Sequence, residues 1–193
     1  MRKIEEFWIE FEKEEKTGAV ASVIYDACDS LKGAIITVFL IFALAFRVVG
    51  VDGDSMNNTL QNGDWLAVSG VTVNLDRGDI VVVNQPWERN VPIIKRVIGV
   101  EGDTVDIDFE EGKVYVNGEE IYEPYIADKT TLSYDVVFPV TVGKDKIFVM
   151  GDNRNDSLDS RSSKIGMIDV HYVLGKALFR FYPASDWDIY DIN

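Results

Sequence analysis

The sequence predicts a mainly β domain preceded by one membrane-anchor helix. At 193 residues the chain has room for one compact domain and an appendage. Residues 33–46 carry no charge, whereas short apolar runs separated by turn residues follow residue 51, which is typical of a β-rich domain. We therefore divide the chain into a leader (1–32), an anchor helix (33–51) and a β-rich domain (52–193).

The leader combines many charges with apolar residues at helical spacing. Ile4, Phe7, Trp8 and Phe11 would lie on one face of a helix, with glutamates on the other face. Three interpretations stay open: an amphipathic helix lying on the membrane, a helix packed against the anchor, and a solvated charged leader.

Residues 33–51 are predicted to span the membrane once. The uncharged run 33–46 has 14 residues, fewer than the roughly 20 of a typical spanning helix, and by itself is also compatible with a buried core helix. Residues 48–51 continue the apolar character, and Arg47 can extend its charged end to the interface. The glutamate-rich stretch ahead of the run argues against a cleaved signal peptide, so we expect a retained anchor.

Basic residues set the orientation of this anchor. Only Arg47 follows the span before Arg77, whereas five basic residues precede it: Arg2, Lys3, Lys13, Lys16 and Lys32. The positive-inside rule therefore places the N-terminus in the cytoplasm and the β-rich domain outside. The net charge of −14 argues against nucleic acid and anionic headgroups as partners, so any membrane contact is expected to be apolar.

Seven apolar runs after residue 51 are predicted as strands. They are 65–69, 79–84, 93–101, 104–109, 113–116, 147–150 and 173–182. Asn117-Gly118 predicts a two-residue hairpin, because both turn positions require a positive φ. Gly102-Asp103 predicts a weaker turn of the same kind.

Ser55 and Lys95 are the candidates for nucleophilic chemistry. A serine hydroxyl needs a base to take its proton, and a lysine can do so only as the neutral amine. Lys95 lies in the apolar run 93–100, where burial would favour that neutral form. The only histidine, His171, lies far along the chain and is expected to be structural. The alternatives are a turn serine that caps a short helix and a surface lysine on a strand.

Four motifs that include these two residues occur in one order along the chain: 51–56 (VDGDSM), 77–82 (RGDIVV), 95–99 (KRVIG) and 150–161 (MGDNRNDSLDSR). In this order and spacing the chain resembles the bacterial type I signal peptidases, which are serine endopeptidases with a Ser/Lys dyad. The resemblance extends to Tyr182-Pro183. It implies a signal-peptidase-like β-rich catalytic domain held at the outer face of the bacterial cytoplasmic membrane.

The resemblance also implies the reaction and the partners. Such an enzyme removes N-terminal signal peptides from exported preproteins and cuts after a small residue, in an Ala-X-Ala type of junction. The implied partners are the signal peptides of secretory preproteins, the lipid bilayer and, as a further candidate, the secretion translocon. No cofactor is implied.

By the same resemblance Ser55 attacks the scissile carbonyl, Lys95 accepts its proton, and water releases the acyl-enzyme. The oxyanion is bound by the Ser55 backbone N–H; Gly53 stands where some members carry a second, hydroxyl donor. Met56 is expected to add apolar surface near the nucleophile, with ordinary core packing as the alternative, and Arg96 to shape the site. A further departure from the family is Asn58, where proline is usual.

Residues 151–161 contain three aspartates at short spacing, which raises the possibility of a metal site. The segment does not fit the calcium-loop template. Arg154 occupies the third position, Ser157 the turn position that requires glycine, and Ser163 the twelfth. We therefore predict no metal.

The resemblance implies instead that this segment is a scaffold for the dyad. Ser157 is expected to hydrogen-bond Lys95, and Asp159 to pair with Arg161. Four more residues are expected to support the site: Asp152, Asn153, Arg154 and Ser160.

Two other functions fit parts of the pattern. A self-cleaving Ser/Lys protease of the LexA/UmuD type shares the dyad, but such proteins are soluble and cut an upstream Ala-Gly bond, a dipeptide that this chain lacks. A catalytically silent, membrane-anchored β domain that binds exported proteins is the second alternative, which Gly53 and Asn58 keep open.

Overall fold

The computed structural model describes residues 22, 24–40, 42–43, 45–70, 74–84 and 91–183. The chain divides into two compact units, 1–44 and 45–193, which we describe separately. The amphipathic pattern predicted for the leader, from Ile4 to Phe11, lies outside the described residues.

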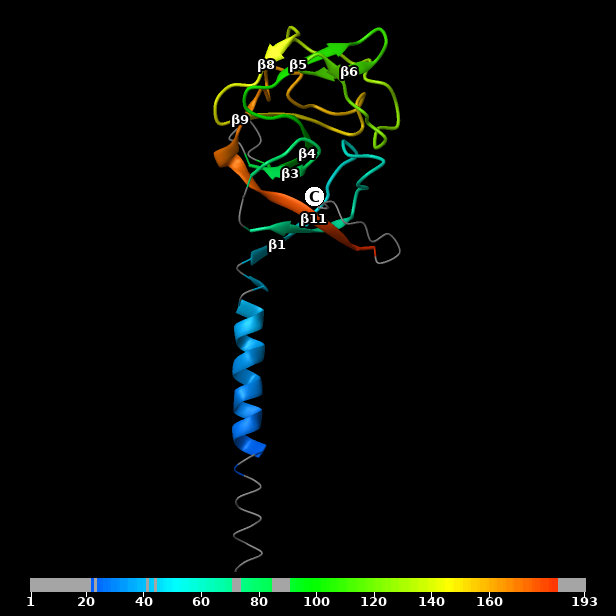
Figure 1. The fold of residues 1–193 in the computed structure, drawn as a ribbon. Helices are drawn as coiled ribbons and strands as arrows, with labels where there is room; N and C mark the ends of the chain where they lie inside the picture. The colour runs from blue at the N-terminus through cyan, green and yellow to red at the C-terminus, as the bar shows by residue number, and fades with distance from the viewer. Residues whose placement is uncertain are drawn as a thin grey trace, which may run out of the picture. The chain divides into compact units, whose positions relative to one another are not determined.

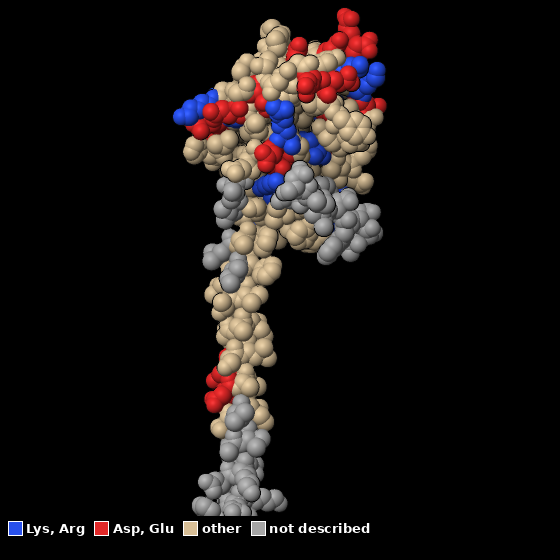
Figure 2. Space-filling model, in the orientation of Figure 1, with Lys and Arg blue, Asp and Glu red and all other residues tan. Residues whose placement is uncertain are grey.

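In the first unit, residues 24–40 form a continuous helix whose side chains are exposed. The helix surface is uncharged over most of its described length (Figure 2). Its second half exposes several large apolar side chains, among them Ile35, Ile36, Val38, Phe39 and Leu40, and Phe42 beyond it is exposed as well. Within the described residues, no helix combines the length and the hydropathy that crossing a bilayer requires.

The predicted anchor range, 33–51, is not helical throughout. Phe46–Gly50 form strand β1, which pairs antiparallel with the next strand from Phe46↔Ser69 to Gly50↔Trp65. Val48 and Val49 are β-branched and favour an extended backbone, and they pair in register with Ala67 and Leu66 of the neighbouring strand. The expectation that residues 48–51 lengthen the helix is therefore wrong.

The second unit contains two antiparallel sheets and is mainly β, as predicted (Figure 1). The seven-stranded sheet has the order β1-β2-β11-β3-β4-β9-β10, and the four-stranded sheet has the order β7-β6-β5-β8. The remaining strands are β2 (Trp65–Ser69), β3 (Ile80–Val83), β4 (Ile93–Gly99), β5 (Thr104–Asp108), β6 (Lys113–Val116), β7 (Glu119–Glu120), β8 (Val140–Thr141), β9 (Lys146–Met150), β10 (Ile168–Asp169) and β11 (Val173–Tyr182). A short 3-10 helix, Val170–Tyr172, connects β10 to β11.

All seven predicted strands are present, with small differences at their ends. The hairpin is confirmed as well, because Asn117 and Gly118 have φ of 56° and 84° and join β6 to β7. Gly102, with φ of 86°, lies in the turn between β4 and β5. Strands β8 and β10 were not predicted, since two residues are too short a run to show periodicity.

Strand β4 contributes to three hydrophobic clusters. Ile94 packs against a first cluster that includes Met56 and Leu60. Val97 belongs to a second cluster and Ile98 to a third. Because apolar side chains surround this strand, Lys95 is only 3% exposed.

The register of β4 places its polar residues beside two other segments. Lys95 is opposite Val81 of β3, and Arg96 is opposite Met150 of β9. The segment that follows Met150 therefore begins next to Arg96, which brings residues 151–161 to the base of the candidate site.

Candidate active site

Ser55 and Lys95 meet, although 40 residues separate them. Lys95 Nζ lies 2.6 Å from Ser55 Oγ and donates a second hydrogen bond, of 3.0 Å, to the Ile94 carbonyl oxygen. Lys95 is buried and Ser55 is half-buried. The amine is therefore within hydrogen-bond reach of the hydroxyl that it would have to deprotonate.

Burial lowers the pKa of Lys95 from 10.5 to about 8. The carboxylates of Asp159 and Asp152 act in the opposite direction, because they favour the ammonium form, and Arg161 disfavours it. A lysine with a pKa near 8 is neutral in an appreciable fraction of molecules at mildly alkaline pH, which is what a general base needs.

The nucleophile segment is a series of turns. Gly53 has φ of +100°, a conformation that residues with a side chain rarely adopt, and its N–H donates to Asn62 Oδ1 at 3.1 Å. A backbone requirement thus explains glycine at the position where some family members have a hydroxyl. Met56 is 1% exposed within the first cluster, so it has the core-packing role that was the alternative interpretation.

Gly151 lies directly against the nucleophile segment. A Cβ at this position would overlap the Ser55 carbonyl oxygen and the Ser157 hydroxyl, so only glycine fits. The next residues bind the same segment: Asn153 N donates to Ser55 O and Asn153 Nδ2 to Asp54 O, both at 3.1 Å. This close contact explains a glycine that the sequence did not single out.

A buried ion pair connects β4 to this loop. Arg96 Nε and Nη2 donate to Asp152 Oδ1 and Oδ2 at 2.8 and 2.6 Å. Asp152 Oδ2 also accepts the Thr59 hydroxyl at 2.6 Å, which ties the loop to the end of the nucleophile segment. The predicted supporting residues Asp152 and Asn153 thus contact the segment that carries Ser55.

Asp159 and Arg161 form a second buried pair, as expected, and both side chains are fully buried. Arg161 Nε lies 2.8 Å from Asp159 Oδ1. Ser157 differs from the expectation, because its hydroxyl donates to Asp159 Oδ2 at 2.8 Å and is not one of the hydrogen-bond partners that the structure gives Lys95. The Asp159 carboxylate lies only two residues from Ser157 and is held in place by Arg161. A carboxylate is also a stronger acceptor for a hydroxyl than a neutral amine. Ser160 Oγ accepts from Val149 N at 3.0 Å and holds the loop to β9.

Arg154 makes contacts that the sequence did not predict. Its guanidinium pairs with the Glu123 carboxylate and donates to Thr130 Oγ1 at 2.8 Å. Tyr125, two residues after Glu123, lies over Arg96. Pairings between residues about 30 positions apart leave no periodic signal in the sequence.

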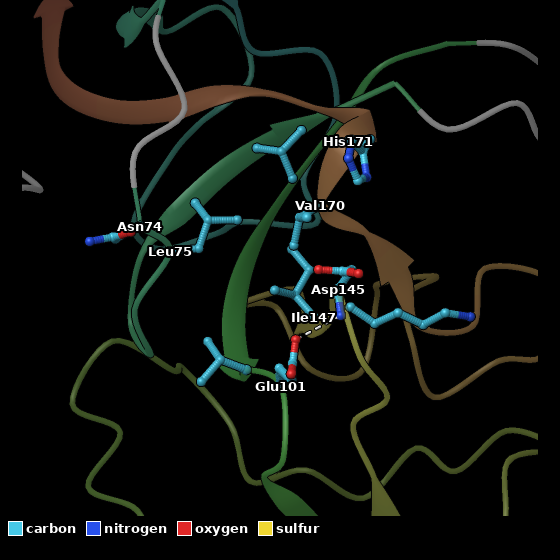
Figure 3. Close-up of a pocket in the computed structure, with 10 residues that line it drawn as sticks. Asn74, Leu75, Glu101, Asp145, Ile147, Val170 and His171 are labelled. Carbon is cyan, nitrogen blue, oxygen red and sulfur yellow. Dashed lines mark hydrogen bonds between the residues drawn. The ribbon is translucent and has the colours of Figure 1, made fainter.

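A pocket of about 480 Å³ is lined by residues other than Ser55 and Lys95 (Figure 3). Its apolar lining residues are Leu75, Val100, Ile147, Val170 and Val173, and its polar ones are Asn74, Glu101, Asp145, Lys146 and His171. Asp145 N donates to Glu101 Oε2 at 2.8 Å, and exposed His171 lies with Nδ1 2.7 Å from Asp169 Oδ1. Neither Ser55 nor Lys95 lines this pocket, so the only histidine is not part of the serine–lysine arrangement.

A mainly β domain with a serine hydroxyl bonded to a desolvated lysine amine defines the class of a serine hydrolase without a catalytic histidine. Residues 25–182 match the family model described as signal peptidase, peptidase S26. The chain belongs to this family of serine endopeptidases, which remove signal peptides, and the prediction of a signal peptidase is thereby confirmed.

Two relatives, both signal peptidases of Bacillus species, agree with this assignment. A signal peptidase I of Bacillus licheniformis is 35% identical over 184 residues, which cover 90% of this chain and 96% of that protein. Signal peptidase I S of Bacillus subtilis is 38% identical over 165 residues, covering 79% and 86%. A crystal structure of a signal peptidase I from Enterococcus faecalis is 28% identical, covers 55% of this chain and 98% of that chain, and has a TM-score of 0.47.

Proposed function

We propose that the chain cuts signal peptides from preproteins with Ser55 as nucleophile and Lys95 as general base, after a small residue of an Ala-X-Ala type of junction. One observation carries the proposal. The Lys95 amine is 2.6 Å from the Ser55 hydroxyl and is only 3% exposed, so it is both in reach and desolvated. The reaction needs only these side chains, backbone donors and water.

In the first half of the reaction, Ser55 Oγ forms a bond to the scissile carbonyl carbon while its proton moves to Lys95 Nζ. The tetrahedral oxyanion is stabilised by the Ser55 N–H, because the Gly53 N–H is already bonded to Asn62. Collapse breaks the C–N bond, and Lys95 returns the proton to the leaving amine. The product at this stage is an acyl-enzyme on Ser55.

In the second half, neutral Lys95 takes a proton from water, and the hydroxide attacks the ester carbon. Collapse breaks the ester bond, releases the signal peptide as a free acid and returns the proton from Lys95 to Ser55 Oγ. The hydrogen bond from Nζ to the Ile94 carbonyl oxygen fixes the direction of the amine during both proton transfers.

The scaffold residues act by holding this geometry. The two buried pairs, Arg96–Asp152 and Arg161–Asp159, keep loop 151–161 in place against the nucleophile segment. We assign Ser157, Asn153, Arg154 and Ser160 the same supporting role through the contacts described above. The substrate would lie extended, and β1 is an edge strand of the seven-stranded sheet that offers main-chain hydrogen bonds.

The N-terminal helix is proposed to anchor the enzyme in the cytoplasmic membrane, with residues 1–32 inside and the catalytic domain outside. The exposed apolar side chains of Ile35, Ile36, Val38, Phe39 and Leu40 support this placement, as does the distribution of basic residues around the helix. The bilayer is then a partner, and the translocon that delivers preproteins is a second one. Because β1 begins at Phe46, the anchor would end before that residue.

The test is cleavage of a preprotein with an Ala-X-Ala junction by the full chain in detergent. Ser55→Ala and Lys95→Ala are expected to be inactive although folded, and the exposed Lys144→Ala serves as the control for loss of a lysine. Cutting that persists in Lys95→Ala would show that the base is wrongly assigned. A cut elsewhere than after the final alanine would contradict the proposed specificity.

A further inference from the structure

Glu123, Tyr125 and Arg154 form a cluster against Arg96 of β4, and we call these three residues the loop clamp. The Tyr125 hydroxyl donates to Glu123 Oε1 at 3.0 Å, and the Arg154 guanidinium pairs with both oxygens of the same carboxylate. The Arg154 side chain is fully buried and that of Glu123 is 6% exposed. The clamp therefore fixes the position of the Tyr125 ring.

The Tyr125 ring lies on the guanidinium of Arg96, with Cζ 3.9 Å from the ring centroid. Arg154 Cζ is farther from the same ring, at 5.9 Å. At 3.9 Å a guanidinium on a tyrosine face makes a favourable cation–π contact, which is stronger where water is excluded. The ring thus covers one face of Arg96.

The edge of the Arg96 guanidinium is bonded at the same time. Nε and Nη2 donate to the two oxygens of Asp152, and Nη1 donates to Gly78 O at 2.7 Å. With its edge bonded and a face covered, Arg96 has one favoured position. In that position it neutralises Asp152, whose carboxylate also binds Thr59 at the end of the nucleophile segment.

The charge of Asp152 matters for the neighbouring base. Lys95 directly precedes Arg96, and the Asp152 carboxylate raises the pKa of Lys95 against the larger lowering by burial. If Arg96 no longer held Asp152, this carboxylate would be less compensated and would favour the ammonium form more strongly. The contact that keeps Arg96 in place therefore also favours the neutral amine.

We propose that Tyr125 is a positioning residue for the dyad, whose ring holds Arg96 on Asp152 and so keeps that charge compensated beside the Lys95 amine. The inference rests on the proposed Ser55/Lys95 mechanism. The ring carries this role and the hydroxyl only orients it, so phenylalanine at this position should preserve the effect.

The first test is the pH dependence of kcat/KM on an Ala-X-Ala preprotein. In Tyr125→Leu the acid limb should move to higher pH by about half a unit or more, which lowers kcat/KM about threefold below the limb and leaves the alkaline plateau largely intact. Tyr125→Phe should retain the parent's limb. The matched control is Tyr122→Leu in the same loop, because Tyr122 is 88% exposed.

A purely structural role for Tyr125 predicts a different result. Loss of folded protein would lower the profile by the same factor at every pH without moving its midpoint, and that outcome would overturn the inference. An equal midpoint shift in Tyr122→Leu would overturn it as well, because the effect would then not be specific to the ring on Arg96.

A second readout does not depend on activity. In the Ser55→Ala chain, the rate of Lys95 acetylation by acetic anhydride is measured by mass spectrometry over a pH series, with and without Tyr125→Leu. Tyr125→Leu should shift the midpoint of labelling upward. An inactive parent would count against the proposed function, whereas an unchanged labelling midpoint would count against Tyr125, so the two failures are distinguishable.

Discussion

Asp159→Asn gives the sharpest test of the buried scaffold, because stability and pH dependence should respond in different ways. The carboxylate accepts from Arg161 Nε and Nη2 at 2.8 and 2.9 Å, from Ser157 Oγ at 2.8 Å and from Gly151 N at 3.0 Å. Asparagine keeps the shape but removes the charge. Arg161, fully buried, would then lack a counter-ion.

The expected loss in the free energy of unfolding depends on the hydrogen-bond acceptors that remain around Arg161. Removing one partner of a buried pair costs about 3–5 kcal/mol. Arg161 keeps three main-chain acceptors, Leu132 O at 2.9 Å, Arg154 O at 2.6 Å and Ser157 O at 3.4 Å, which compensate part of its charge. We therefore expect the low end, a loss of about 3 kcal/mol in the free energy of unfolding.

The same substitution should move the acid limb of kcat/KM to lower pH. Asp159 raises the pKa of Lys95, so its neutralisation makes the amine easier to deprotonate. The assay combines urea unfolding with the pH profile, and the exposed Asp106→Asn on β5 is the control. A loss below about 1 kcal/mol, or a limb that moves to higher pH, would refute the reasoning.

Three further predictions concern the dyad and the loop beside it. In the parent, kcat/KM should rise with pH through a midpoint near the Lys95 pKa of about 8, because only the neutral amine acts as base; a midpoint near pH 5 would contradict this. Lys95→Met should be more stable than the parent at pH 7, by up to about 3 kcal/mol. Between the pKa values of about 8 and 10.5 the folded parent binds fewer protons than the unfolded chain, so its free energy of unfolding rises with pH through that window. The difference in stability between Lys95→Met and the parent should therefore shrink from pH 8 to pH 10.5. Thermal unfolding of both proteins at several pH values checks the direction of this change. Gly151→Ala should lower the free energy of unfolding by about 1–3 kcal/mol through overpacking. It should also lower kcat while changing KM less, since the new Cβ displaces the Ser55 main chain. A variant with the kcat of the parent would refute the close contact.

The sequence predicted the fold best where alternation of apolar and polar residues was long enough to detect. Strands such as β11, with ten residues, were therefore found, whereas the two-residue strands β8 and β10 were not. Strand β1 was missed because its valines continue an apolar run. Hydropathy alone does not separate the end of an apolar helix from the start of a strand that continues the apolar run.

The site was predicted in its chemistry but not in all its contacts. Motif order brought Ser55 and Lys95 together as candidates, and the structure places them in hydrogen-bond contact. Residue type does not fix which acceptor a hydroxyl chooses, and in the structure the Ser157 hydroxyl donates to Asp159, so its expected bond with Lys95 stays a prediction. The contact of Tyr125 with Arg96 depends on a loop path that no local pattern encodes.

The position of β4 among three hydrophobic clusters determines at which stage of folding the environment of Lys95 forms. In an unfolded chain Lys95 is an ordinary ammonium at neutral pH and has no Ser55 beside it. The pKa of its amine falls to about 8 only after side chains from all three clusters have closed around the strand and desolvated it. If Lys95 is the general base, as proposed, proteolytic activity should therefore appear only with the completed fold, because a partly folded chain lacks both the desolvated amine and its contact with Ser55.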